Sequence, residues 1–489
     1  MPPAITVTEP TAPIVLVAPA GRADAVTPGS PELRHPGRFT LALSAAVFAF
    51  SLVQTLVVPA LPTIGRELGA SSLGTGWILT AFLLAGAVFS PVVGNLGDRF
   101  GHRRVLLATL LVFAAATVVA AAAPNLGVLL AARVVQGIST ATFPLALALA
   151  RSTLTGPRLA AAFGWIPGMI GLGAGLALVV GGVVVDALSW RWIFIIGAIL
   201  ILISAAMVVA WVPRGRSTVQ SGPIDVQGIL LLTGGLVGIL LAVSQGGAWG
   251  WTSPWTIGVG AAGILLLLAL VFVELRSVAP VVDVRTFRQG PIALLSLLTV
   301  VVGFVPYVCY VALPLLMQAP TSTGYGHGMS VTVSALALLP SAILVFFGGR
   351  LTPALVARLG GGGTAVTAAA VMGVGAVALA VWPSTPWIVI LGFAVLGLGN
   401  GIGYAICAQL VVTWSPAHET GAAIGLNSVV RTIGSAAAAP VVTALLAAVA
   451  VAGFDPALAF SLAFWVAAGA SAVGAVVAIV LVLKARRAG

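Results

Sequence analysis

Residues 94–107, Gly-Asn-Leu-Gly-Asp-Arg-Phe-Gly-His-Arg-Arg-Val-Leu-Leu, join two long apolar segments of the chain. Four charged residues make this stretch too polar for the hydrocarbon of a bilayer, so it marks one face of a membrane: Asp98, Arg99, Arg103 and Arg104. Three glycines allow two helix ends to approach each other closely: Gly94, Gly97 and Gly101. The stretch therefore predicts a joint between two membrane-spanning helices that can open and close.

The composition of the whole chain is that of an integral membrane protein. Of its 489 residues, 60% are hydrophobic and 7% are charged, whereas soluble domains carry about 25% charged residues. The apolar runs are long, unlike the short alternating segments of a transmembrane β-barrel. Because a spanning helix needs about 20 apolar residues, we predict an all-α integral membrane protein with about 14 transmembrane helices.

These helices are expected to form two pseudo-symmetric six-helix bundles with two further helices inserted between them. The expected spans are 39–62, 73–95, 104–123, 126–150, 160–184, 190–212, 226–246, 255–275, 290–317, 330–350, 364–383, 386–412, 420–452 and 456–483. The expected divisions are a disordered cytoplasmic tail (1–37), an N-terminal bundle (38–213), the inserted helices with their linkers (214–288), a C-terminal bundle (289–484) and a short cytoplasmic tail (485–489).

The net charge of +11 comes from basic residues that lie mostly on one side of the expected membrane. If both termini are cytoplasmic, the outer loops hold only Arg66 and Arg191, Arg133 and Arg431 lie inside spans, and every other basic residue is cytoplasmic. Cytoplasmic loops carry the excess of Lys and Arg, so we expect this orientation and no nucleic-acid partner. The two cysteines and four scattered histidines lack the spacing of a metal site, and no metal or cofactor is expected.

Two sequence echoes predict that the halves of the chain are an internal repeat. Residues 136–138 (Gln-Gly-Ile) in the fourth span resemble residues 400–402 (Asn-Gly-Ile) in the twelfth, at the same depth. The segment 348–360 is a degraded copy of 94–107. Repeated halves with a substrate site at their interface are characteristic of secondary transporters.

Residues 94–107 resemble the loop between the second and third spans of the major facilitator superfamily, whose pattern is Gly-x-Leu-x-Asp-Arg-x-Gly-Arg-Arg. The resemblance implies a conformational switch that holds the two bundles in the outward-open state, formed by Gly94, Asp98, Arg99, Gly101, Arg103 and Arg104. The excess of arginine over lysine, with abundant Ala, Gly and Val, suggests a GC-rich bacterial genome, so we expect a location in the bacterial inner membrane.

The fourth span resembles the superfamily's drug:proton antiporters through Arg133, Gln136 and Gly137, which match the pattern Arg-x-x-Gln-Gly. Residues 190–192 (Trp-Arg-Trp) are similar to a signature of the fourteen-span antiporters. The resemblance implies that Arg133 links proton uptake to substrate; an arginine that bonds backbone carbonyls and holds helices together is the alternative. For residues 190–192 an interfacial anchor is favoured, with Arg191 paired to Asp186.

The chain departs from that family where it usually carries an acid. Aligning Thr55 with the first-span pattern places Val53 at the position of the aspartate, with Gln54 beside it. A carboxylate in a dry site can exchange a proton near neutral pH, whereas valine and glutamine cannot. Because none of the 11 acidic residues falls near the middle of an expected span, proton coupling, another ion and loss of coupling all stay open.

Candidate substrate contacts lie in the second half. Phe304, Tyr307 and Tyr310 in the ninth span suit a bulky apolar ligand, although such residues more often serve ordinary packing. Asn427 and Arg431 are four residues apart and share one helix face. Together with Gln54, Arg133, Gln136, Gly137 and Asn400, they are the expected coupling or cavity residues.

The predicted function is export of hydrophobic or amphipathic drug-like molecules by alternating access, coupled to proton influx. A lipid or metabolite carrier and a proton-independent facilitator are the alternatives within transport. An enzyme is not expected, because no span carries a histidine or an acid pair at depth. The expected partners are a small substrate, protons and the lipid bilayer, with the chain acting as a monomer.

Overall fold

The computed structural model describes residues 35–70, 72–214, 225–277, 290–415 and 420–488. Long helices form nearly all of these ranges, and no strand occurs in them. The helices are α1 (Pro36–Glu67), α2 (Ser72–Phe100), α3 (His102–Ala121), α4 (Leu126–Gln136), α5 (Thr142–Thr153), α6 (Gly156–Ala187), α7 (Arg191–Trp211), α8 (Val226–Trp249), α9 (Pro254–Glu274), α10 (Gly290–Gln318), α11 (Val331–Val381), α12 (Pro386–Trp414), α13 (Thr420–Val451) and α14 (Pro456–Ala488). Residues 1–34 of the predicted tail lie outside the described ranges, and α14 continues into the predicted second tail.

The expected number of spans is recovered once α11 is divided. In the described ranges, 13 helices are long and apolar enough to cross a membrane. One of them, α11, has 51 residues, whereas about 20 suffice for one crossing. Its backbone leaves the helical region at Gly360, where φ is 70° and ψ is 172°. The helix therefore supplies the tenth and eleventh spans, and the prediction of an all-α membrane fold is confirmed.

The joint at residues 94–107 is shorter than the sequence predicted. The second span was expected to end at residue 95 and the third to begin at 104, but α2 continues to Phe100 and α3 begins at His102. Only Gly101 leaves the helical conformation, with φ at 94° and ψ at 121°. A positive φ carries no steric penalty at glycine, so one residue turns the chain and the charged residues extend the two helices.

The predicted loop between the tenth and eleventh spans is likewise wrong. Residues 351–363 are helical except at Gly360, so the two halves of α11 meet at a single glycine. Gly101 and Gly360 thus occupy matching places in the two halves of the chain. We call the end of the molecule that holds both glycines the Gly101 end.

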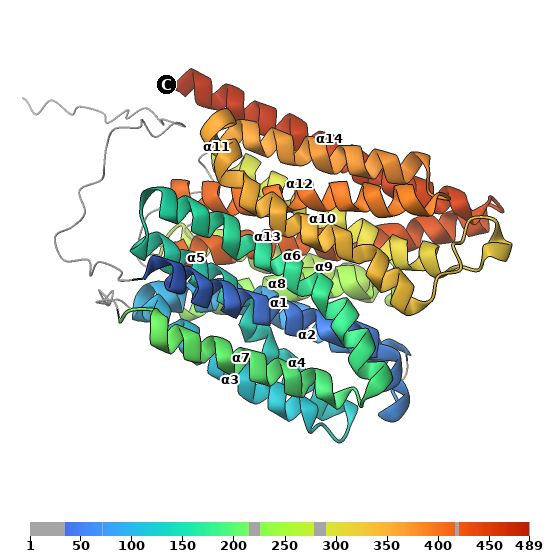
Figure 1. The fold of residues 1–489 in the computed structure, drawn as a ribbon, viewed down its shortest axis with the longest axis horizontal. Coiled ribbons are helices and arrows are strands. Elements are labelled where there is room, and N and C mark those ends of the chain that lie inside the picture. The colour runs from blue at the N-terminus through green and yellow to red at the C-terminus, as the bar shows by residue number, and fades with distance from the viewer. Residues whose placement is uncertain (1–34, 71, 215–224, 278–289, 416–419, 489) are drawn as a thin grey trace, which may run out of the picture.

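The helices form two bundles that lie side by side, and the long helices of both bundles run in roughly the same direction (Figure 1). The first, α1–α7, encloses one apolar cluster that includes Phe39, Leu56 and Phe113. The second, α10–α14, encloses another that includes Val305 and Phe464. The domain boundaries proposed from sequence stay a prediction.

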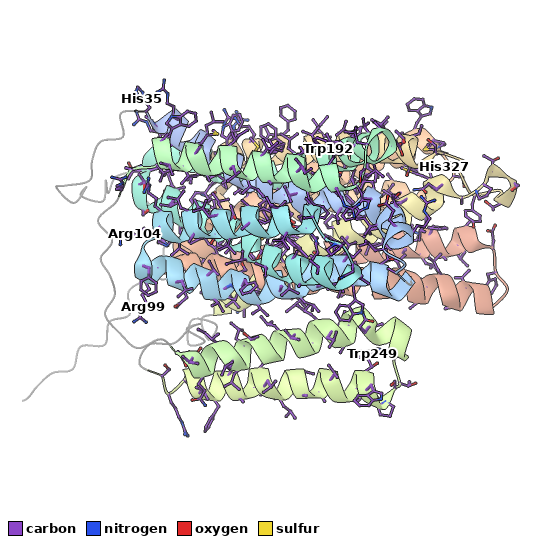
Figure 2. All side chains as sticks on the ribbon, turned by 90° about the horizontal axis from the view of Figure 1, so that it is seen from below. His35, Arg99, Arg104, Trp192, Trp249 and His327 are labelled. Atoms are coloured by element: carbon purple, nitrogen blue, oxygen red, sulfur yellow. The ribbon has the colours of Figure 1, made fainter. Side chains whose placement is uncertain are left out.

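The remaining two helices, α8 and α9, form a hairpin beside the bundles (Figure 2). They pack on each other, and α8 also contacts α2 and α13. Their outward faces are apolar and exposed, as at Leu230, Trp255 and Leu265. Such faces match a lipid environment, in which apolar side chains lose nothing by exposure.

The bundles meet through small residues of α6 and α11, and of α2 and α13. A Cβ atom on Gly164 of α6 would lie 2.8 Å from the carbonyl oxygen of Gly349 in α11. A Cβ atom on Gly425 of α13 would lie 2.7 Å from the carbonyl oxygen of Ser90 in α2. Both positions lie in the half of the molecule nearer the Gly101 end, where glycine lets the backbones of the two bundles approach.

Candidate functional site

Arg133 lies in the first bundle, where its side chain is fully buried, with an exposed fraction of 0%. Its Nε donates a hydrogen bond to the carbonyl oxygen of Ile78 at 3.0 Å, and Nη1 donates to Oε1 of Gln136 at 2.9 Å. The guanidinium carbon lies 4.4 Å from the ring centroid of Phe82. Arg133 in α4 is therefore fixed to α2 by a hydrogen bond and a cation–π contact.

Gln136 extends this connection to a third helix. Its Nε2 donates to the hydroxyl of Thr117 in α3 at 2.9 Å, and that hydroxyl donates to the carbonyl of Phe113 at 2.7 Å. The chain Ile78–Arg133–Gln136–Thr117 thus joins α2, α4 and α3. Within the described residues, Arg133 has no carboxylate partner and its Nη2 makes no hydrogen bond. The buried charge is held by dipoles and an aromatic ring.

Gly137 marks a change of helix type directly after this network. Residues Gly137–Ala141 form a 3₁₀ turn, and α5 then continues the span from Thr142. A Cβ atom on Gly137 would lie 2.6 Å from Cβ of Ala85, so only glycine fits against α2 here. Thr140 donates to the carbonyl of Gly86 at 2.8 Å and fixes the turn on the same helix. A 3₁₀ segment inside a longer helix is often a functional hinge.

At the Gly101 end, the predicted switch residues divide into separate contacts. Asp98 Oδ1 lies 2.7 Å from Nε2 of His102, and the Asp98 side chain is only 6% exposed. Arg103 donates to the carbonyls of Val212 and Val209 at 2.8 and 3.1 Å, which ties α3 to the end of α7. Arg99 lies 5.5 Å from the ring of Phe100. The two arginines labelled in Figure 2, Arg99 and Arg104, lie at the same end of the molecule.

The link between the bundles at this end is made by a residue that the sequence analysis did not select. Arg151, near the end of α5, attracts Asp98 electrostatically and donates from Nη2 to the carbonyl of Ser415 at 3.0 Å. Ser415 directly follows α12 of the second bundle. Ala408, Val412 and Ile424 of that bundle also join the apolar cluster of the first. The predicted switch therefore connects to the second bundle through Arg151.

In the second bundle, Arg431 of α13 donates from Nη1 to the hydroxyl oxygen of Tyr404 in α12 at 2.7 Å. Unlike Arg133, Arg431 is half-buried. Four residues earlier, Asn427 accepts a hydrogen bond from Thr299 of α10 at 2.8 Å. The structure thus places Asn427 and Arg431 on contacts with two neighbouring helices, and it adds Tyr404, which the sequence analysis passed over.

The predicted aromatic lining forms a connected row. The ring centroids of Tyr307 and Tyr310 in α10 are 5.9 Å apart, and Tyr310 lies 5.3 Å from Phe393 of α12. Both tyrosines are half-buried, as is Phe304 on the same helix. Tyr307 is close enough to Tyr404 and Arg431 to interact with both electrostatically. The tyrosines therefore belong to the surroundings of Arg431.

Two further predicted positions lie apart from these groups. Asn400 of α12 is 5% exposed, and its Oδ1 is a buried acceptor that has no hydrogen-bond partner in the described part of the chain. Its counterpart Gln136 is fully bonded, so the two echoed amides differ in their surroundings. Gln54 in α1 is half-buried, next to Val53, which packs against Gly197 of α7.

The prediction that Arg191 pairs with Asp186 is wrong. Arg191 Nη1 instead lies 3.3 Å from Oε2 of Glu67, at the end of α1. The same carboxylate accepts a hydrogen bond from the indole of Trp190 at 2.7 Å. Trp190 and Arg191 therefore fasten the start of α7 to α1 at the end opposite Gly101. Within the described residues, no group of three or more His, Cys, Asp or Glu side chains could hold a metal ion.

Two helical bundles, joined by close glycine contacts and each carrying a buried or half-buried arginine, define the general plan of a two-fold repeated membrane transporter. The family model described as Major Facilitator Superfamily matches residues 43–225. The chain is 30% identical over 429 residues to the "Tetracenomycin C resistance and export protein" of Streptomyces glaucescens, which covers 86% of this chain and 78% of that protein. The chain belongs to the major facilitator superfamily.

Other comparisons agree with this assignment. The "Puromycin resistance protein pur8" of Streptomyces alboniger is 30% identical over 80% of this chain and 78% of its own length. Among solved structures, the proton:xylose symporter XylE superimposes with a TM-score of 0.64 at 13% identity, covering 90% of this chain and 94% of that one. This second similarity concerns the fold alone. The protein is a multi-pass membrane transporter with antibiotic-export relatives.

Proposed function

We propose that this protein exports hydrophobic or amphipathic drug-like compounds from the bacterial cytoplasm by alternating access. The main support for this proposal is the similarity of the chain, over most of its length, to proteins named for tetracenomycin C export and puromycin resistance. In this proposal the chain lies in the cytoplasmic membrane as a monomer with both termini in the cytoplasm. The arginine-rich Gly101 end then faces the cytoplasm, as the positive-inside rule requires.

The contacts between the bundles support an alternating mechanism. Arg151 with Ser415, Gly425 with Ser90 and Gly164 with Gly349 all join the bundles in the half of the molecule toward the Gly101 end. With that end in the cytoplasm, the described conformation is closed toward the cytoplasm. When these contacts separate, the substrate path opens to the cytoplasm. When they form again, the path to the cytoplasm closes and the substrate can leave only to the outside.

The driving force distinguishes two versions of the proposal. In the first, protons enter through the Asp98–His102 pair, whose atoms lie 2.7 Å apart at the Gly101 end. In the second, transport needs no proton site. The positions of the acids favour the second version, because all six acidic residues of the described ranges lie at or next to helix ends: Glu67, Asp98, Asp186, Asp225, Glu274 and Asp455.

Dye uptake into inverted vesicles tests the export function. The vesicles contain the full chain and receive a panel of fluorescent aromatic dyes that includes cations, neutral compounds and anions. We expect uptake of at least one dye above that of vesicles lacking the protein. A fluorescent phospholipid in the same vesicles tests the alternative, and lipid transfer without uptake of any dye would establish a lipid carrier instead.

A matched pair of glycine variants links this uptake to movement of the bundles. Gly425→Leu places a side chain where a Cβ atom alone would lie 2.7 Å from the Ser90 carbonyl, whereas a Cβ atom on Gly182 meets nothing within 4 Å. We expect Gly425→Leu to lose uptake and Gly182→Leu to retain it. Equal uptake by the two variants, at equal expression, would contradict an alternating mechanism that closes through α2 and α13.

A further inference from the structure

The charges at membrane depth are all positive. In the described ranges, acidic residues occur only at or beside helix ends, and the other five acids lie outside those ranges, in segments that the sequence places outside every span: Glu9, Asp24, Glu32, Asp283 and Glu419. Arg133 lies in the last turn of α4, but its span continues through α5 to Thr153, and Arg431 lies 11 residues after the start of α13, so both lie well inside their spans. The interior of this transporter therefore carries positive charge that no carboxylate of the described residues neutralises.

Only one of these two cations has exposed side-chain surface. Arg133 is fully buried and covered by Phe82. Arg431 is half-buried, and its one hydrogen bond within the described residues goes to the neutral hydroxyl of Tyr404. A guanidinium has five N–H donors. Arg431 therefore retains donors for a further acceptor, and an anionic oxygen such as that of a carboxylate forms a strong, charge-assisted hydrogen bond with a guanidinium.

One aromatic ring lies against this cation, and others continue from it in a row. Tyr404 lies with its ring centroid 4.7 Å from the guanidinium carbon, and Tyr307 interacts electrostatically with both groups. Tyr310 and Phe393 extend the row with centroids 5.3 Å apart. Half-buried tyrosines beside an arginine suit a flat aromatic ligand, because its ring packs on theirs while its anionic group meets the guanidinium.

We propose that Arg431, with Tyr404, Tyr307 and Asn427, binds an aromatic anion, and that the membrane potential drives its export. This proposal rests on the proposed export function and specifies its substrate class and driving force. Arg431 moves with its bundle and returns to its starting position at the end of each transport cycle. The net charge that crosses the membrane in one cycle is therefore the charge of the substrate. An inside-negative potential expels anions, with an equilibrium ratio of about fifty-fold per 100 mV for a single charge. No proton-binding acid at depth is required.

Two dyes with the same ring system and opposite charge provide the test. Fluorescein is an anion at neutral pH, and rhodamine 6G is a cation. Inverted vesicles that contain the full chain receive either dye under a potassium-diffusion potential, inside positive, or under a pH gradient with no potential. We expect the protein to raise the initial rate of fluorescein uptake under the potential, and to leave rhodamine 6G uptake at the level of vesicles without the protein.

Variants of one residue connect this selectivity to the site. Arg431→Gln is expected to lower fluorescein uptake by about 10-fold to 100-fold, as loss of a charge-assisted hydrogen bond predicts. Arg431→Lys keeps the charge and is expected to retain more uptake than Arg431→Gln. Arg358→Gln is the matched control, since it removes the same charge from an exposed arginine near Gly360. Each variant is first checked for a monodisperse peak and a wild-type melting temperature in detergent.

The outcomes separate this proposal from the function on which it rests. Rhodamine 6G uptake without fluorescein uptake would confirm an exporter and overturn the anion site. Fluorescein uptake that follows the pH gradient and ignores the potential would overturn the driving force. Normal fluorescein uptake by a folded Arg431→Gln variant would remove Arg431 from the site. Absence of uptake for either of these dyes and for the whole dye panel would overturn the export function and the anion site together.

Discussion

Arg133 in the first bundle and Arg431 in the second are both cations inside membrane-spanning helices, yet their surroundings are opposite. Arg133 is fully buried, bonds to Ile78 and Gln136, and lies against Phe82. Arg431 is half-buried and bonds only to Tyr404 among the described residues. The first arginine completes a connection between helices, whereas the second is held at one point with donors to spare.

The difference shows that a charge in a membrane helix has two distinct uses. A cation at the bilayer centre requires at least ~2.5 kcal/mol on insertion scales, so it persists only where something compensates. Around Arg133 the protein itself supplies the compensation, through a carbonyl, an amide and a ring. Around Arg431 the compensation is incomplete, and a ligand can provide the rest. A structural arginine and a binding arginine are thus distinguished by counting their partners.

The largest difference between the two arginines is expected in their contributions to the stability of the protein. Arg133→Ala removes two hydrogen bonds between charged or buried groups and leaves Gln136 and the Ile78 carbonyl without this partner, which should destabilise the protein by about 2–4 kcal/mol. Arg431→Ala removes one hydrogen bond between helices, worth about 0.6 kcal/mol in membrane proteins. Thermal unfolding of both variants in the same detergent measures the difference. Equal losses of melting temperature would contradict separate roles for the two arginines.

The next effect compares the two echoed amides. Gln136→Leu breaks bonds to Arg133 and Thr117 and should destabilise the protein by about 1–3 kcal/mol. Asn400→Leu replaces a buried amide whose Oδ1 has no partner within the described residues, and should change stability by less than about 0.5 kcal/mol. If Asn400→Leu leaves the melting temperature unchanged but lowers dye uptake, the unbonded acceptor serves the substrate. If both the melting temperature and the dye uptake are unchanged, Asn400 has a packing role only.

The smallest effect concerns the link between the bundles. Arg151→Gln weakens the attraction to Asp98 and the hydrogen bond to Ser415, a loss of about 1 kcal/mol that should shift the population toward the form open at the Gly101 end by about fivefold. Spin labels at the exposed positions Arg104 and Arg358, in a chain with both native cysteines replaced by alanine, report the distance between the bundles. A distance distribution identical to that of the parent protein would show that Arg151 does not hold them together.

The sequence was sufficient for the features that depend on local pattern. Apolar length predicted the spans, and the fourth-span pattern selected Arg133 and Gln136, which are three residues apart and form a hydrogen bond. The position of a joint between two helices within residues 94–107 was also predicted, although the charged residues there belong to the helices and only Gly101 turns the chain. Each of these features is decided by residues close together in the chain.

Features that depend on residues far apart were not accessible. Arg191 pairs with Glu67, which is 124 positions away, although Asp186 is its neighbour in sequence. Arg151 meets Ser415 across 264 positions, and Tyr404 meets Arg431 between two different helices. No local periodicity indicates such partners, because they follow from the way whole helices pack. The continuation of helix on both sides of Gly360 was also missed, because the ends of helices are the least certain part of a prediction from sequence.

The single-residue joints at Gly101 and Gly360 restrict how the length of this chain can change. Most loops tolerate insertions and deletions because spare residues absorb them, but here helix follows helix with one glycine between them. Adding or removing one residue would rotate the next helix by about 100° about its axis. For α3, that rotation would turn Thr117 away from Gln136 and toward lipid. In these hairpins, the number of residues therefore matters as much as their identity, and an epitope tag inserted there would disturb the packing.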